Sequence, residues 1–289
     1  MRIALGLPSR VASVSRESML EWVTRAERGP FSSVVVTDRV VSQALEPFSV
    51  LAMAAGATQR IRLMTSVVLA PIRETTLLAR QAATIDVLSG GRFTLGIGIG
   101  VRDNDYLATG FDFHRRGRRV EEQLPILRRL WAGEPLSNEI GSIGPPRDRG
   151  PELLIGGYVP AIIRRIALWG DGYMAPGGGE PESMLKMWQQ IEQAWREAGR
   201  EGKPRWVGAS YFALGPNAAG HAARYINANY GYNPDLAARR LRTLPASRAA
   251  VEDAIKRQRD MGVDEFILRP CAEELDQMEL LAEITSRLQ

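Results

Sequence analysis

A (β/α)8 barrel, the TIM-barrel fold of the α/β class, is the architecture that the sequence predicts. Short apolar runs rich in β-branched residues alternate from end to end with longer amphipathic stretches, a pattern typical of strand–helix units around a parallel sheet. The 289 residues accommodate eight such units, whereas a doubly wound sheet more often has five or six strands. We find no linker, so we expect residues 1–289 to form one domain with short insertions.

Each expected strand is a short apolar run, and each is followed by a stretch with the spacing of an amphipathic helix. The strands are expected at residues 2–7, 33–37, 61–68, 92–98, 152–155, 172–175, 205–213 and 265–269. The helices that follow them are expected at residues 15–28, 46–58, 75–88, 116–131, 161–169, 181–198, 218–229 and 273–288, with a further helix at 247–261 before the last strand. Segments 133–150 and 229–245 are expected as excursions from the barrel.

The strand ends are the places where the sequence predicts a functional site. In a barrel of this kind, reactive residues lie at the C-terminal ends of the strands, on the loops that lead into the helices. The candidates by this rule are Asp38 and Arg39, Ser66 and Val67, residues 98–104, 156–158 and 175–179, and the stretch after Phe212.

Glycines at positions 96, 98 and 100 alternate with isoleucines at the end of the fourth expected strand. A glycine within a strand costs stability and leaves no side chain to pack, so a series of them requires a reason such as close ligand contact or crowding. A cofactor that approaches the backbone is the obvious candidate.

Composition and charge narrow the class of protein. With 45% hydrophobic and 24% charged residues, the chain has the composition of a water-soluble globular protein, and no apolar run approaches the roughly 18 to 20 residues that cross a bilayer. The N-terminal segment has no signal-peptide pattern, and the single Cys271 cannot form an internal disulfide, so we expect a cytoplasmic location.

The net charge of +4 does not indicate a nucleic-acid binding protein, because the basic residues are spread along the chain. The densest basic cluster, at residues 115–119, is followed by Glu121 and Glu122, which is typical of a solvated helix face with charges of both signs. One or two of its arginines can still face an anionic ligand.

Several segments together resemble the luciferase-like flavin-dependent oxidoreductases, a family that includes bacterial luciferase, alkane monooxygenases and enzymes dependent on the deazaflavin F420. The strongest stretch comprises RIRLMTSVVLAP at 60–71, LARQAATIDVLSGGR at 78–92 and LGIGIG at 95–100. GFDFHRRGRRVEE at 110–122, LRRLW at 127–131, LIGG at 154–157 and ALWGDGY at 167–173 continue it. The resemblance covers nearly the whole chain and implies a cofactor, FMN or F420, at the mouth of the barrel.

The resemblance also implies which residues hold that cofactor. Similar enzymes have a non-prolyl cis peptide at the end of the third strand, behind the cofactor ring, and Ser66-Val67 occupies this position. A glycine pair before a helix resembles the phosphate cradle of the family, where free N–H groups and the helix dipole face an anion. The implied cofactor residues are Ser66, Val67, Gly98, Gly100, Asn104, Gly156, Gly157, Tyr158, Ala175, Gly177 and Gly178.

Asp38 and Arg39 are the candidate catalytic residues, since relatives often carry an acidic residue followed by His at this point. The arginine is a departure, because a guanidinium stays protonated at neutral pH and has to bind an anionic substrate or stabilise developing charge. Asp38 is expected to contact the cofactor edge or to orient Arg39, and the alternative is that it only caps the following loop. His114 is interpreted as a surface or capping residue and His221 as structural. With no ligand spacing among these histidines and Cys271, no metal site is predicted.

The reaction stays open at this stage. Reduced FMN, supplied by a separate reductase, would oxygenate a small organic substrate, whereas F420 would exchange a hydride with it; the sequence slightly favours F420. A cofactor-free barrel with a binding role is the alternative, favoured by the missing histidine and opposed by the retained glycines. A lyase or aldolase is disfavoured because no lysine stands at a strand end. A homodimer is expected from the resemblance alone.

Overall fold

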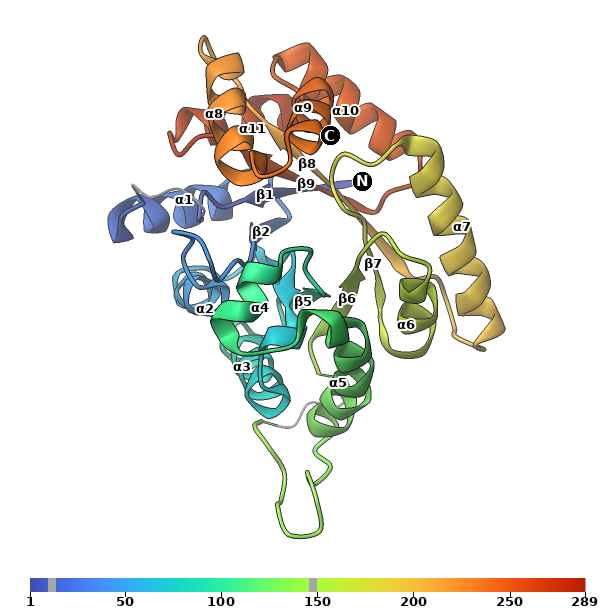
Figure 1. Cartoon of the computed structure of the whole chain (residues 1–289). Helices are drawn as coiled ribbons and strands as arrows, with labels where there is room; N and C mark the ends of the chain where they lie inside the picture. Colours follow the sequence, from blue (N-terminus) through green and yellow to red (C-terminus); the bar gives the residue numbers. More distant parts are fainter. Residues whose placement is uncertain (10–13, 146–149, 289) are drawn as a thin grey trace.

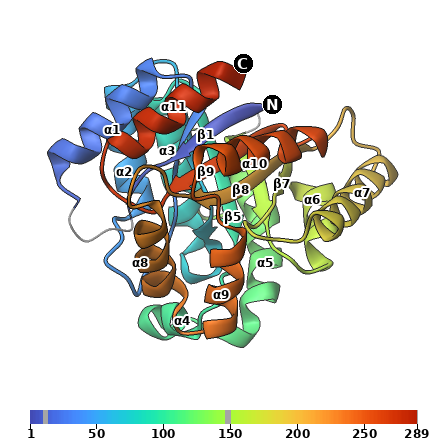
Figure 2. The same ribbon diagram turned by 90° about the horizontal axis from the view of Figure 1, so that it is seen from above.

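The computed structural model describes residues 1–9, 14–145 and 150–288, and in these ranges it shows a closed barrel of parallel strands surrounded by helices (Figures 1 and 2). The strands are β1 (Arg2–Gly6), β2 (Ser33–Val36), β3 (Arg62–Thr65), β4 (Val68–Leu69), β5 (Phe93–Gly98), β6 (Glu152–Gly156), β7 (Gly172–Met174), β8 (Arg205–Phe212) and β9 (Glu265–Pro270). Their order is β3-β2-β1-β9-β8-β7-β6-β5-β4, and β3 also pairs with β5, which closes the ring.

The predicted barrel is therefore confirmed. Only Ser66 and Val67 separate β3 from β4, and the two segments occupy one strand position of the barrel. The described residues therefore form a barrel with eight strand positions. Every expected strand is present, with ends within one or two residues of those predicted.

The helices cover the outside of the barrel. They are α1 (Arg16–Arg28), α2 (Pro47–Ala57), α3 (Thr75–Leu88), α4 (Asp103–Thr109), α5 (Arg116–Trp131), α6 (Ala161–Trp169), α7 (Pro181–Glu197), α8 (Ala218–Tyr230), α9 (Pro234–Thr243), α10 (Arg248–Asp260) and α11 (Asp276–Leu288), with 3-10 turns η1 (Ala70–Ile72) and η2 (Phe113–Arg115). All nine expected helices are present. None of the helices in the described ranges combines the length and apolar character of a membrane span.

The two expected excursions differ in structure. The first runs from the end of α5 as the narrow projection at the bottom of Figure 1, where Pro135 and Ser142 form an isolated bridge; residues 146–149 lie outside the described ranges. The second contains α9, a helix that was not predicted, although Asn233 caps it and Pro234 occupies its first turn. The short helix α4 was also not predicted.

Two apolar layers hold the barrel. The larger lies between the strands and the helices and includes Trp22, Trp131 and Trp206, which are fully buried. The smaller fills the inside of the barrel with side chains such as Met64, Leu154, Met174, Val207 and Ile267. The interior is thus packed with side chains, and space for a ligand has to be found at one of its ends.

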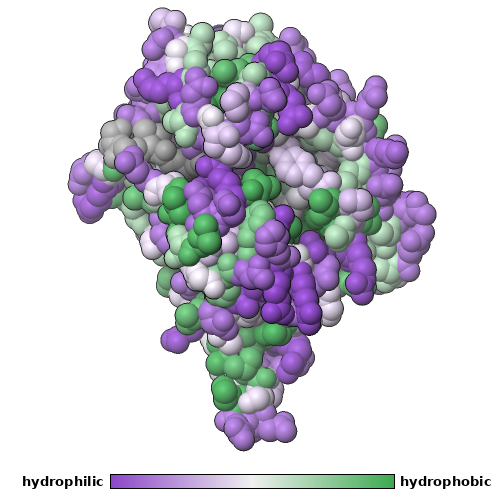
Figure 3. All heavy atoms as spheres, in the orientation of Figure 1, coloured by the Kyte–Doolittle hydropathy of each residue, from purple (hydrophilic) through white to green (hydrophobic). Residues whose placement is uncertain are grey.

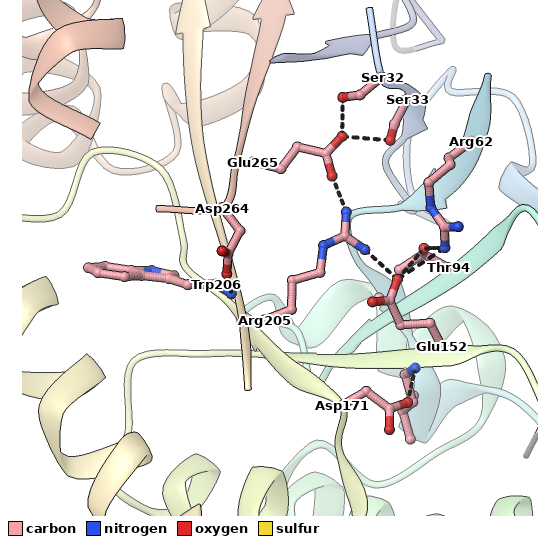
Figure 4. Close-up of polar contacts among 12 residues, drawn as sticks. Ser32, Ser33, Arg62, Thr94, Glu152, Asp171, Arg205, Trp206, Asp264 and Glu265 are labelled. Atoms are coloured by element: carbon pink, nitrogen blue, oxygen red, sulfur yellow. Dashed lines mark hydrogen bonds and ion pairs between the residues drawn. The ribbon is translucent and has the colours of Figure 1, made fainter. Parts of the chain in front are cut away.

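The N-terminal end of the barrel is closed by a network of charged and hydroxyl side chains (Figure 4). Arg205, at the start of β8, contacts both Glu152 and Glu265. Thr94 donates to Glu152 at 2.6 Å, and Ser33 donates to Glu265 at 2.7 Å. Burial alone would raise the pKa of Glu265, but Arg205 and the neighbouring serines hold that pKa below its ordinary value.

Candidate active site

A cavity of about 330 Å³ opens at the C-terminal ends of the strands. Figure 2 shows α4, α8 and α9 on this side of the barrel, and Figure 3 shows that hydrophilic side chains predominate on the face that carries α4 and α9. The predicted site residues that line the cavity are Asp38, Arg39, Ser66, Val67, Gly98, Gly100, Gly156, Gly157, Tyr158, Ala175 and Gly177. The strand-end rule therefore located the cavity.

Asn104 and Gly178 are not among the residues that line this cavity. Asn104 lies on α4, and its Oδ1 is buried without a hydrogen-bond partner in the described residues. Gly178 has a φ of +75° and lies beside the guanidinium of Arg240. A direct role of these two residues in cofactor binding stays a prediction.

The structure shows crowding, one of the two reasons expected for the glycine series, in β5. A Cβ at Gly96 would lie 2.2 Å from the carbonyl oxygen of Thr65, and a Cβ at Gly98 would lie 2.7 Å from Cγ2 of Val67. A Cβ at Gly156 would also meet Val67, at 3.0 Å. These glycines make room for the chain between β3 and β4, so crowding inside the barrel explains them, and Val67 becomes the side chain that faces the cavity.

The peptide bond between Ser66 and Val67 is cis, as the resemblance implies. Ser66 is nearly buried, and both its carbonyl oxygen and its hydroxyl accept hydrogen bonds from Nη2 of Arg269. Arg269 comes from β9, which β1 and β2 separate from β3, and its side chain reaches past the ends of these two strands to Ser66. We call the part of the cavity lined by Arg269 and Ser66 its floor.

The loop between β6 and α6 forms another wall. Gly157 has a φ of +154°, and a Cβ there would lie 2.9 Å from Ile162. The hydroxyl of Tyr173 donates to the carbonyl oxygen of Gly157 at 3.2 Å, and burial raises the pKa of this tyrosine, which keeps its proton on the hydroxyl. No side chain of the described residues caps the N-terminus of α6, but the N–H groups of Ile162 and Ile163 donate to the carbonyl oxygens of Val159 and Pro160, each at 3.0 Å. The dipole of the helix, rather than these two N–H groups, is what this end offers to an anion.

Asp38 is held by partners other than the one expected. Its Oδ2 accepts hydrogen bonds from the backbone N–H of Leu69 at 3.0 Å and from Nη2 of Arg73 at 3.1 Å. These contacts run to β4 and to the turn after it, and the expected role of Asp38, to contact the cofactor edge or to orient Arg39, stays a prediction. The partner, Arg73, lies 35 residues further along the chain, in the turn after β4, and no local pattern indicated it.

Arg39 forms a buried ion pair with Asp105 of α4, with Nε 2.9 Å from Oδ2. Asp105 also accepts hydrogen bonds from the backbone N–H groups of Val40 and Val41, at 3.2 and 2.8 Å. This carboxylate therefore fixes the loop after β2 and balances the charge of Arg39. An anionic substrate at Arg39 would have to compete with Asp105.

The structure brings further cations to the cavity that sequence reasoning did not select: Arg102, Arg116, Arg165, Arg240 and Arg269. Arg165 pairs with Glu121 at 2.9 Å. The other four have no carboxylate within ion-pair distance in the described ranges, so the cavity carries an excess of positive charge. Arg269 stands at the end of the last strand, and extending the strand-end rule to that strand would have found it.

Aromatic side chains of β8 and of the α8–α9 segment complete the wall of the cavity. The hydroxyl oxygens of Tyr211 and Tyr230 are 2.7 Å apart, and Tyr232 lies under the guanidinium of Arg102 at 4.2 Å from the ring centroid. Tyr211, Tyr230 and Tyr232 all line the cavity. Phe212 is fully buried in the core instead.

Neither histidine lines the cavity. The backbone N–H of His114 is bonded to Asp112, which caps the η2 turn, and His221 lies on α8 beside Arg224. The sequence interpretation of both as non-catalytic residues agrees with these positions.

Comparison with solved structures shows the same fold in proteins of low sequence identity. An F420-dependent secondary alcohol dehydrogenase, solved with an F420–acetone adduct, aligns with a TM-score of 0.78 and 17% identity and covers 100% of both chains. The oxygenating constituent of 3,6-diketocamphane monooxygenase from Pseudomonas putida, solved with FMN, aligns with a TM-score of 0.73 and 16% identity over 99% of this chain and 98% of the solved chain.

A curated relative is closer in sequence. An uncharacterized protein of Mycobacterium tuberculosis is 32% identical over 163 residues, which cover 54% of this chain and 56% of the relative. The match thus spans about half the length of that protein. The family model described as luciferase-like monooxygenase matches residues 1–277, and the chain therefore belongs to the luciferase-like monooxygenase family.

Proposed function

We propose that this protein is an oxidoreductase that binds a flavin-type cofactor at the barrel mouth, and that the cofactor is the deazaflavin F420. The observation that carries the proposal is the cavity at the strand ends, which is bounded by backbone at Gly156, Gly157 and Gly177 and by arginines that have no carboxylate partner among the described residues. Such a wall suits a large anionic ligand, because backbone N–H groups and guanidinium groups both donate to phosphate and carboxylate oxygens.

The residues present fit the phosphate end of such a cofactor. The N-terminus of α6 has no side-chain cap and Gly157 adds no side chain of its own at this wall. A Cβ at Gly177 would come within 2.9 Å of the carbonyl oxygen of Ala209. Tyr158, Ala175 and Gly177 line the same part of the cavity. We assign this wall to the phosphate group.

The ring end is assigned to the adjoining wall, where Val67 projects between the glycines of β5 and β6. Ser66, Val67, Gly98 and Gly100 would back the ring there. When bound, F420 supplies the hydride acceptor or donor, and the chain binds and orients it.

F420 is preferred over FMN because of the charge at the rim. Its tail carries carboxylates beyond the phosphate, and Arg102, Arg116 and Arg240 stand at the cavity without carboxylate partners in the described ranges. The chain is similar in fold to both an F420-dependent dehydrogenase and an FMN-containing monooxygenase. The fold therefore does not distinguish the two cofactors, and the charge at the rim is the reason to prefer F420.

A proton donor has to accompany hydride transfer to a carbonyl or from an alcohol, and we assign this role to Tyr211. Tyr211 lines the cavity, and its hydroxyl is 2.7 Å from the hydroxyl of Tyr230, so a proton can pass between the two. No histidine lines the cavity to take the role instead.

The resemblance further supports a homodimer in the cytoplasm and a separate enzyme that reduces the cofactor. Light scattering of the purified protein tests the first of these expectations.

Titration of the purified apoprotein with F420 and, separately, with FMN tests the proposal, with absorbance and fluorescence as readouts. We expect saturable binding of F420, at least about tenfold tighter than that of FMN, because the rim charges act on the longer acidic tail. Preferential binding of FMN would assign the chain to the oxygenating members of the family. Binding of neither would support a cofactor-free barrel and overturn the proposal.

A further inference from the structure

Arg269 differs from the other unpaired arginines of the cavity in its position. Arg102, Arg116 and Arg240 each donate to a backbone carbonyl of a loop or helix and lie against an aromatic ring, which places them in the walls. Arg269 instead leaves the end of β9, inside the ring of strands, and reaches Ser66. It is the cation at the floor of the cavity.

The fold holds this guanidinium in place. A Cβ at Gly6 would lie 2.7 Å from Cγ and 2.9 Å from Cα of Arg269, so only glycine on β1 leaves room for the side chain. Nη2 donates to the Ser66 hydroxyl at 2.5 Å and to its carbonyl oxygen at 3.3 Å. The ring of Tyr211 lies 5.9 Å from the guanidinium carbon. Arg269 is thus positioned before any ligand arrives.

Part of its hydrogen-bonding capacity is unused. Both of its hydrogen bonds in the described residues come from Nη2, so Nε and Nη1 have no acceptor there. The acidic residues of the cavity cannot serve, because Asp38 is bound to Arg73 and Asp105 to Arg39. A ligand oxygen with negative charge is the partner that this arrangement lacks.

The cofactor phosphate is not that partner under the proposed function, on which this inference rests. The phosphate wall lies at the ends of β6 and β7, and β8 separates it from β9 in the ring of strands. We infer that Arg269 binds an acidic group of the substrate, so that the substrate is a small organic acid whose carboxylate lies on the cavity floor beside Tyr211. The neighbouring carbon of such an acid is then close to the hydroxyl that we assign as proton donor.

The test uses two probes of nearly the same shape, benzoate and its neutral isostere benzamide, titrated by calorimetry into the cofactor-free protein. We expect the wild type to bind benzoate at least about tenfold more tightly than benzamide, and Arg269→Gln to lose this preference. Arg118→Gln is the matched control, because Arg118 is exposed on α5 and pairs with Glu122; it should keep the preference. An equal preference in wild type and Arg269→Gln, or none in the wild type, would overturn the inference.

Ser66→Ala provides a second variant, since it removes one acceptor of Arg269 and leaves the arginine in place. We expect it to weaken the binding of benzoate and to leave the affinity for benzamide unchanged. An unchanged affinity for benzoate would contradict the idea that Ser66 positions Arg269.

Titration of Arg269→Gln with F420 separates the acid site from the proposed function. Wild-type F420 affinity in this variant supports an acid site distinct from the cofactor site, and a loss equal to that of benzoate would assign Arg269 to the cofactor instead. If the wild type binds no F420 but prefers benzoate through Arg269, the acid site stands and the proposed function fails.

Discussion

The two ends of the barrel differ in whether their arginines are paired with carboxylates. At the N-terminal end, Arg205 lies between Glu152 and Glu265, and Arg62 and three hydroxyl groups complete the network. At the mouth, four arginines have no carboxylate partner in the described residues. A charge left uncompensated in a folded protein is costly, so the closed network indicates stability and the open one indicates ligand binding.

Breaking the N-terminal network should have the largest effect on folding. Glu265→Gln removes a carboxylate whose side chain is fully buried, and we expect the free energy of unfolding to fall by about 3 kcal/mol. This expected loss is at the low end of the range for breaking a buried ion pair, because Arg205 still has Glu152 as a partner. Urea denaturation measures it. Glu283→Gln, which breaks the exposed pair with Arg248, should cost less than about 1 kcal/mol; an equal loss in both variants would contradict the contrast.

The stability difference between the wild type and Glu265→Gln should depend on pH. Its pKa is lowered in the folded protein from an ordinary value of 4.5, so the unfolded state binds the proton more readily. The stability advantage of the wild type over Glu265→Gln should be complete above that ordinary value and decrease as the pH falls through the folded pKa. Urea titrations at a series of acidic pH values measure it, and an advantage independent of pH would contradict it.

At the mouth, Gly157→Ala should affect binding more than folding. The new methyl group, 2.9 Å from Ile162, displaces the loop that we assign to the phosphate, and we expect F420 affinity to fall at least about tenfold. Gly110→Ala is the matched control, because Gly110 also has a positive φ, of +73°, and nothing lies within 4 Å of its Cβ position. Fluorescence titration compares the two, and wild-type affinity in Gly157→Ala would count against the cradle.

The smallest effect is expected at the rim. Arg240 donates to the carbonyl oxygen of Gly177 at 2.8 Å and lies over Tyr230, so Arg240→Gln should weaken F420 binding by a few fold and reduce its salt dependence. Arg239→Gln, an exposed neighbour on α9 that does not line the cavity, serves as control. A salt dependence equal in both variants would show that Arg240 does not face the tail.

Strand positions and the place of the site were predictable from the sequence because both follow from local patterns. Apolar runs mark the strands, and strand ends mark the mouth, which is why Ser66, Gly157 and Gly177 were selected correctly as cavity residues. The glycine series was located by the same means, although its reason, the space that Val67 takes, depends on a neighbouring strand.

The polar partners were not predictable, since they join residues far apart in the chain. Asp105 reaches Arg39 across 66 positions, and Arg269 reaches Ser66 across 203. The helix α4, which carries Asp105, has seven residues, too few to display an amphipathic repeat. Its stability comes from tertiary contacts, such as that ion pair, and these are visible only in three dimensions.

Val67 and the glycines at 98 and 156 have a practical consequence for redesign of the pocket. A smaller residue at 67 would leave a void on two strands at once, whereas a larger residue at either glycine would collide with the valine. Mutations at the three positions should therefore be strongly non-additive, and a library intended to admit bulkier molecules has to randomise them jointly.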